Sequence, residues 1–99
     1  MWQALLVSTA LGSELDSRIQ LYDALLADGH GALEVAVQRY TELSRTLSDE
    51  DPTLSEALYW LGHGLYDLGR IPEARQALGD GIRNGTCPRC RDLLEVIEI

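Results

Sequence analysis

Apolar residues recur along this chain every three or four positions, which is the spacing of one face of an α-helix. The clearest run occupies the middle of the chain, where leucines lie four, three, four and three residues apart, at Leu54, Leu58, Leu61, Leu65 and Leu68. No segment alternates apolar and polar residues over the length of a strand. The pattern therefore predicts an all-α protein.

Turn residues divide this pattern into segments. Glycines at 12, 29, 31, 69 and 85 follow the ends of apolar stripes, and a charged stretch over 48–53 contains Pro52. We expect an N-terminal helix over 1–12, a helical hairpin over 14–48, a second hairpin over 53–85 and a C-terminal capping helix over 86–99. A chain of 99 residues suffices for one core, so residues 1–99 form a single domain.

The two hairpins repeat at an interval of 38 residues. The matched pairs include Tyr22 and Trp60, Ala24 and Gly62, Gly31 and Gly69, and Ala36 and Ala74. Two antiparallel helices approach closely only where their side chains are small. We therefore expect Gly62 and Ala74 to touch across the second hairpin, and the shared glycine to lie in the turn between the helices.

The second hairpin also follows a more specific pattern. The pattern has a large apolar residue before a Leu-Gly pair, then a turn glycine, an alanine and a bulky residue four positions later. Its positions are filled by Leu58, Leu61, Gly62, Leu65, Gly69, Ile71, Ala74 and Leu78. This order resembles the tetratricopeptide-repeat family, with one good repeat over about 55–88 and a degenerate repeat over about 17–50. In the degenerate copy, Gln20 and Asp23 stand where the family has apolar residues. The resemblance implies an α–α superhelix of two helical hairpins with a flanking helix at each end.

The resemblance also implies that the protein binds a partner peptide or helix in a concave groove, formed by the first helix of each repeat. On this chain the groove would present Glu56, Tyr59, His63, Tyr66 and Asp67 from the second copy, and Arg18, Leu21, Leu25 and Asp28 from the first. Tyr59, His63, Tyr66 and Asp67 share one helix face by spacing alone. The alternative is that these side chains only cover the core.

Charge narrows the choice of partner. The net charge is −8, and ten carboxylates precede Ala57 against three arginines. This balance disfavours nucleic acid and favours a protein with a basic patch. No apolar run reaches the roughly 20 residues of a membrane span, and no positive charge precedes the apolar start as in a secretory signal. We expect a cytoplasmic protein that does not interact with a membrane.

Cys87-Pro88-Arg89-Cys90 is the motif with potential chemistry. Three interpretations stay open: the cysteines pack as small apolar residues, form a dithiol–disulfide pair at a helix start, or supply half of a zinc site shared by two chains. His30 and His63 have no second ligand at metal spacing. No nucleophile is paired with a base and no phosphate-binding loop occurs, so we expect neither an enzyme nor a cofactor.

The sequence thus favours a non-enzymatic adaptor or scaffold. One alternative is a small acidic chaperone for a secreted or assembly-prone subunit, and another is a thiol switch or zinc-linked dimer through Cys87 and Cys90. Repeat stacks leave apolar ends exposed. We expect Trp2, Leu5 and Leu6 to cover one end, and a homodimer to form through the other, at Leu93, Leu94, Val96 and Ile97.

Overall fold

The computed structural model describes the backbone of residues 2–85 and 87–98, and the side chains of residues 16–85 and 87–98. Within these residues it is built of five α-helices and contains no strand. The helices are α1 (Trp2–Gly29), α2 (Leu33–Thr46), α3 (Thr53–Asp67), α4 (Ile71–Arg83) and α5 (Pro88–Ile97). The prediction of an all-α fold is confirmed.

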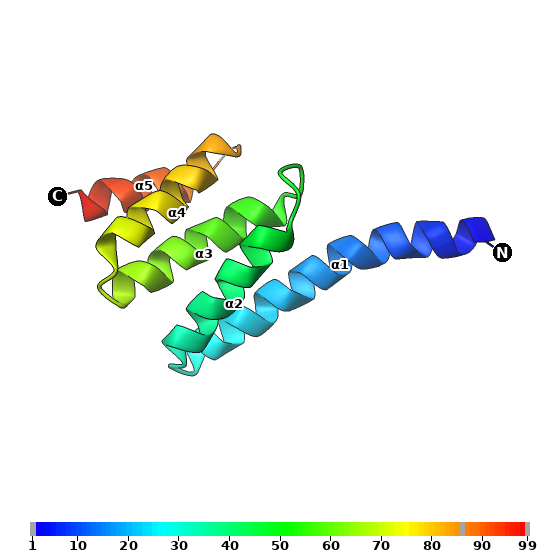
Figure 1. The fold of residues 1–99 in the computed structure, drawn as a ribbon, viewed down its shortest axis with the longest axis horizontal. Coiled ribbons are helices and arrows are strands. Elements are labelled where there is room, and N and C mark those ends of the chain that lie inside the picture. Colours follow the sequence, from blue (N-terminus) through cyan, green and yellow to red (C-terminus); the bar gives the residue numbers. More distant parts are fainter. Residues whose placement is uncertain (1, 86, 99) are drawn as a thin grey trace.

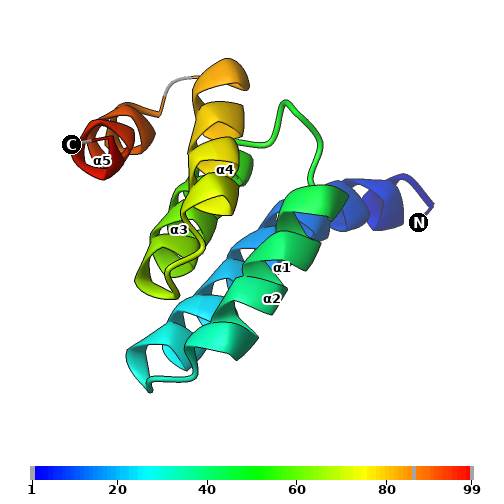
Figure 2. The same ribbon diagram turned by 60° about the vertical axis from the view of Figure 1, so that its left-hand side comes forward.

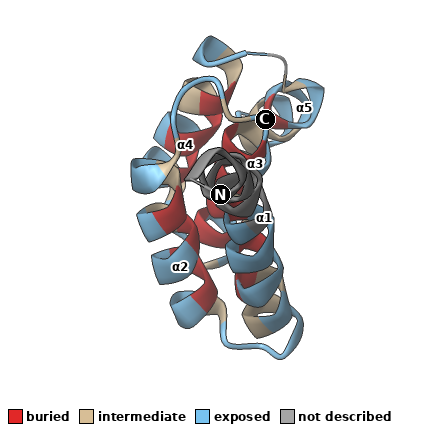
Figure 3. Ribbon diagram, turned by 90° about the vertical axis from the view of Figure 1, so that its right-hand side faces the viewer, coloured by how far each residue is buried: buried red, intermediate tan, exposed pale blue. Residues whose placement is uncertain are grey.

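The helices form two antiparallel hairpins that lie side by side (Figures 1 and 2). Helices α1 and α2 make the first hairpin, and α3 and α4 make the second. The hairpins join where α2 and α1 pack against α3, and α5 then packs on α4 and α3. Buried residues line the inner sides of the helices (Figure 3), and the alanines Ala24, Ala36, Ala57 and Ala74 are completely buried there.

The expected end of the N-terminal helix at Gly12 is wrong. Helix α1 continues without a break from Trp2 to Gly29 and has 28 residues, whereas the next longest helix, α3, has 15. A glycine inside a helix costs only about 1 kcal/mol relative to alanine, and the leucine- and alanine-rich segments around it favour the helix. The side chains of Trp2, Leu5 and Leu6, expected to cover one end of the stack, lie outside the described residues.

The turns of the two hairpins have the same geometry. Gly31 and Gly69 adopt left-handed backbone conformations with φ of 83° and 80°. The N–H of Ala32 donates to the carbonyl of Ala27, and the N–H of Arg70 donates to that of Leu65, both at 2.9 Å. This is the Schellman arrangement, in which a glycine ends the first helix. The shared glycine therefore lies in each inter-helix turn, as the 38-residue repeat predicted.

Three glycines mark close approaches between helices. A Cβ atom on Gly62 would lie 2.5 Å from Cγ of Leu78 on α4, and one on Gly64 would lie 2.8 Å from Cγ2 of Val37 on α2. A Cβ on Gly81 of α4 would lie 2.7 Å from Sγ of Cys90 on α5. The side chain nearest to Gly62 is thus Leu78, one turn beyond Ala74. The contact between Gly62 and Ala74 itself stays a prediction.

Candidate interaction site

The face of α3 that points away from its buried leucines carries the predicted contact residues. Tyr59, His63, Tyr66 and Asp67 lie on this face, and the exposed Glu56 lies two turns before His63. Tyr66 is 39% exposed, and the side chains of His63 and Asp67 are 37% and 41% exposed. Tyr59 is half-buried. We call these five residues the α3 face.

An arginine from α5 covers the first part of the α3 face. The guanidinium carbon of Arg89 lies 4.3 Å from the ring centroid of Tyr59 and 5.3 Å from that of Trp60. The two rings themselves meet edge to face, with centroids 5.1 Å apart. A cation over an aromatic face is attracted by the negative charge density of the ring. Sequence reasoning missed Trp60 and Arg89, because their contact depends on how α5 packs against α3.

His63 and Asp67 lie side by side further along α3. Nδ1 of His63 is 3.2 Å from Oδ2 of Asp67, but the angle at this contact is not that of a hydrogen bond, and Nδ1 is shielded from solvent. The His63 ring also contacts Trp60, with centroids 5.7 Å apart. The imidazole is therefore held between an aromatic ring and a carboxylate, with one nitrogen unpaired among the described residues.

The predicted contact residues of the first hairpin are placed differently. Leu21 is 3% exposed and belongs to the core, so its assignment to a binding surface is wrong. Asp28 is half-buried and accepts a hydrogen bond of 3.3 Å from the hydroxyl of Tyr40. Arg18 is exposed, and Leu25 is half-buried beside Tyr22. Arg18 and the exposed parts of Leu25 and Asp28 remain available to a partner.

A hollow of about 500 Å³ lies between α2 and α4, with α3 as its floor. The floor consists of Leu54, Leu58, Leu61 and Leu65, each of which is at most 7% exposed. Charged side chains surround it, namely Arg45, Asp49, Arg70, Glu73 and Asp80. The floor offers little apolar surface, so the hollow is a weaker candidate for an apolar ligand than the α3 face.

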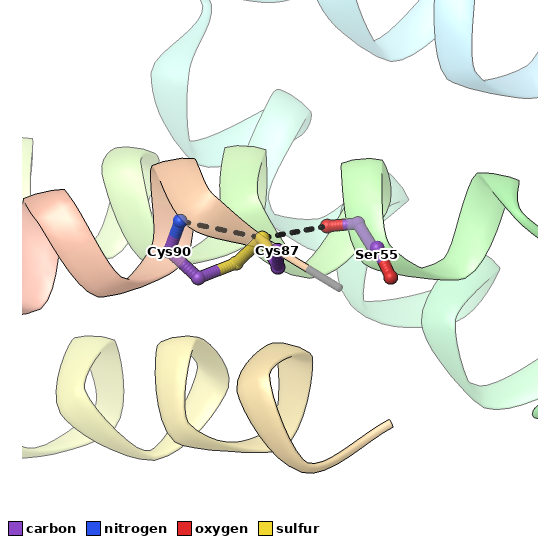
Figure 4. Close-up of a disulfide and its surroundings, with 3 residues drawn as sticks. All are labelled: Ser55, Cys87 and Cys90. Atoms are coloured by element: carbon purple, nitrogen blue, oxygen red, sulfur yellow. Dashed lines mark hydrogen bonds between the residues drawn. A yellow bond between two sulfur atoms is a disulfide. The ribbon is translucent and has the colours of Figure 1, made fainter. Parts of the chain in front are cut away.

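The two cysteines form a disulfide at the start of α5 (Figure 4). Sγ of Cys87 accepts a hydrogen bond of 3.3 Å from the backbone N–H of Cys90, and it lies 3.9 Å from the carbonyl oxygen of Ser55 on α3. A disulfide sulfur has no proton, so the second approach is a contact and not a hydrogen bond. Cys90 is fully buried. Sulfurs joined in this way are not thiolates, and in this state they cannot bind zinc.

Metal ligands do not gather elsewhere in the part of the chain that the structure describes, which contains no cluster of three or more His, Cys, Asp or Glu side chains able to hold an ion. None of the described helices has both the length and the apolar character needed to cross a membrane.

Comparisons of the chain with models of known families, with curated proteins and with solved structures find no match.

Proposed function

We propose that this chain is a tetratricopeptide-type interaction module, which binds a peptide or helix of a partner protein on the α3 face and acts as a cytoplasmic adaptor or scaffold without catalysing a reaction. The observation that carries this proposal is the α3 face itself, where two tyrosines, a histidine and two acids lie together opposite the buried leucines. Matching glycine turns 38 residues apart support the family assignment.

The side chains of the α3 face suit protein recognition. Tyrosine combines a rigid apolar ring with a polar tip, and it is enriched among the residues that dominate binding energies. Tyr59 is already held by the guanidinium group of Arg89 and the ring of Trp60. Because its conformation is restricted before binding, Tyr59 would lose less side-chain entropy when a partner contacts it.

The charge of the chain favours a basic partner. Glu56 and Asp67 are exposed on the α3 face, and the whole chain has a net charge of −8. Opposite charges accelerate association and select against acidic competitors. The partner that fits best is therefore a segment with apolar anchors for the tyrosine rings and Lys or Arg residues at its edges.

Replacing Tyr59 and Tyr66 together by alanine should abolish partner capture. Two central anchors commonly contribute about 2 kcal/mol each, so affinity should fall by a factor of several hundred. The partner would be captured on the immobilised full chain and identified by mass spectrometry. Titration calorimetry would then compare the affinities of the purified parent and variants for this partner. Val35→Ala on α2 is a suitable control, because Val35 is also exposed but lies outside the α3 face. Full binding by the double variant would contradict the proposal.

A thiol switch is a second candidate, which the disulfide favours. Arg89 stands between Cys87 and Cys90 in the first turn of α5, and it lies on Tyr59. A reductase dithiol would supply two electrons and two protons, leaving two thiols here and a disulfide on the reductase. Freeing this turn would change the position of Arg89 and thereby partner affinity. Equal affinities with and without a dithiol reductant would rule out the switch and leave the interaction module unaffected.

A further inference from the structure

The outward face of α1 carries an apolar stripe that nothing in the described structure covers. Ile19, Tyr22 and Leu26 are 49%, 58% and 60% exposed. The side of α1 that faces the core carries a different set, Ser17, Leu21 and Ala24. Single exposed apolar residues are normal on a protein surface, but three in line along one helix form a patch of the kind found at interfaces. We call Ile19, Tyr22 and Leu26 the α1 stripe.

The length of α1 also indicates a missing partner. Helix α2 has 14 residues and can cover only about half of the 28 residues of α1, and the N-terminal part of α1 extends beyond α2 in Figure 1. In the sequence of residues 2–15, Glu14 is the single charged residue. The half of α1 that α2 does not cover has about 14 residues, and an isolated helix of that length is marginal in water. Helix α1 therefore needs a long apolar partner that extends past the first hairpin.

Charges on both sides of the α1 stripe identify that partner. The stripe residues are three and four positions apart, as in the seam of a coiled coil, with Arg18 directly before Ile19 and Asp23 directly after Tyr22. In a parallel pair of identical helices, Arg18 of each copy faces Asp23 of the other, five residues further along. In an antiparallel pair, like charges meet. The stripe is therefore electrostatically self-complementary in the parallel arrangement.

Both charged side chains are free to make this pairing. Arg18 and Asp23 are exposed, and neither forms an ion pair with another described residue. Arg39 donates a hydrogen bond of 3.5 Å to the backbone carbonyl of Asp23, which leaves the carboxylate unoccupied.

We propose that the α1 stripe binds a second copy of this chain, forming a parallel homodimer along α1. The parallel arrangement pairs Arg18 with Asp23 twice. It also brings the two apolar segments of residues 2–15 alongside each other, whereas an antiparallel pair would separate them. This interface is distinct from the C-terminal one expected from the sequence, where Leu93, Leu94 and Ile97 are half-buried against their own chain and only Val96 is exposed.

The first test is sedimentation equilibrium of the full chain. We expect a dimer at micromolar concentration, and Ile19→Glu should weaken it at least about tenfold, because a buried carboxylate would replace an apolar contact. The control Val35→Glu places the same charge on an exposed valine of α2 and should leave the dimer intact. Circular dichroism would verify that each variant stays folded. A monomer at high micromolar concentration would overturn the proposal.

The second test determines the direction of the helices. Arg18→Glu and Asp23→Arg should each weaken self-association about fivefold, because each puts like charges across the parallel interface. An equimolar mixture of the two variants should form the heterodimer preferentially, as measured by native mass spectrometry. The single variants determine the direction, because an antiparallel pair already places like charges opposite each other and neither change would weaken it. Self-association of both single variants as tight as that of the parent would overturn the parallel arrangement. Dissociation by Val96→Glu but not by Ile19→Glu would place the interface on α5 and overturn the proposal altogether.

Discussion

Replacing Gly81 by alanine should destabilise the protein by about 1–3 kcal/mol, whereas the same change at Gly79 should stabilise it by about 0.5–1 kcal/mol. Both glycines lie in α4, so the gain in helix propensity is the same. A Cβ on Gly81 would approach Sγ of Cys90 to 2.7 Å, and this sulfur is buried and bonded to Cys87. A Cβ on Gly79 would have Nη1 of the exposed Arg83 side chain as its nearest neighbour, at 3.5 Å.

Urea unfolding of both variants would measure the two changes in the free energy of unfolding. Each 1 kcal/mol should also shift the melting temperature by about 4–8 °C in a domain of this size. Combining Gly81→Ala with Cys90→Ala removes the sulfur that causes the clash, so the double variant should lose less stability than the sum of the single changes. Stabilisation by both single glycine variants would mean that α5 does not pack on α4 through Gly81 and Cys90.

The hairpins could be predicted from the sequence because two independent signals agree there. The leucine spacing of α3 defines one buried face, and a glycine with positive φ ends the first helix of each hairpin. Gly12 shows the limit of the second signal. A glycine between strong helix formers is not forced into a left-handed conformation, and whether the helix ends there depends on energies of about 1 kcal/mol.

The spacing of apolar residues predicted which side of α3 is buried, but it could not predict which side of α1 is buried. Helix α3 is apolar on one side, so the side that faces the core follows from the sequence. Helix α1 carries apolar residues on two sides, one containing Leu21 and the other containing Ile19, Tyr22 and Leu26. Which of these sides is buried depends on how α2 and α3 pack against α1. The stacking of Arg89 on Tyr59 likewise depends on the position of α5, and local spacing contains no information about it.

Replacing Tyr40 by alanine should cost about 3–5 kcal/mol, because the residue is completely buried. Replacing it by phenylalanine keeps the ring and removes only the hydrogen bond to Asp28, so this change should cost about 0.5–1.5 kcal/mol at pH 8. Urea unfolding of the three proteins would separate the contributions of the ring and of the hydroxyl. A loss below 1 kcal/mol for the alanine variant would contradict the burial of this residue.

The buried Tyr40 phenol should also make the stability of the protein fall at alkaline pH, and Tyr40→Phe tests this. Burial raises the pKa of the Tyr40 phenol well above its usual value of 10.0, and the charge of Asp28 and its hydrogen bond raise it further. Above pH 10 the unfolded chain therefore loses this proton before the folded chain does, and the free energy of unfolding falls as the pH rises. The chain contains no Lys whose titration would overlap. Tyr40→Phe should remove this fall, so its stability should approach and then exceed that of the parent between pH 10 and about 12, measured by urea midpoints. Parallel curves for the two proteins over this range would show that Tyr40 is not buried next to Asp28 in solution.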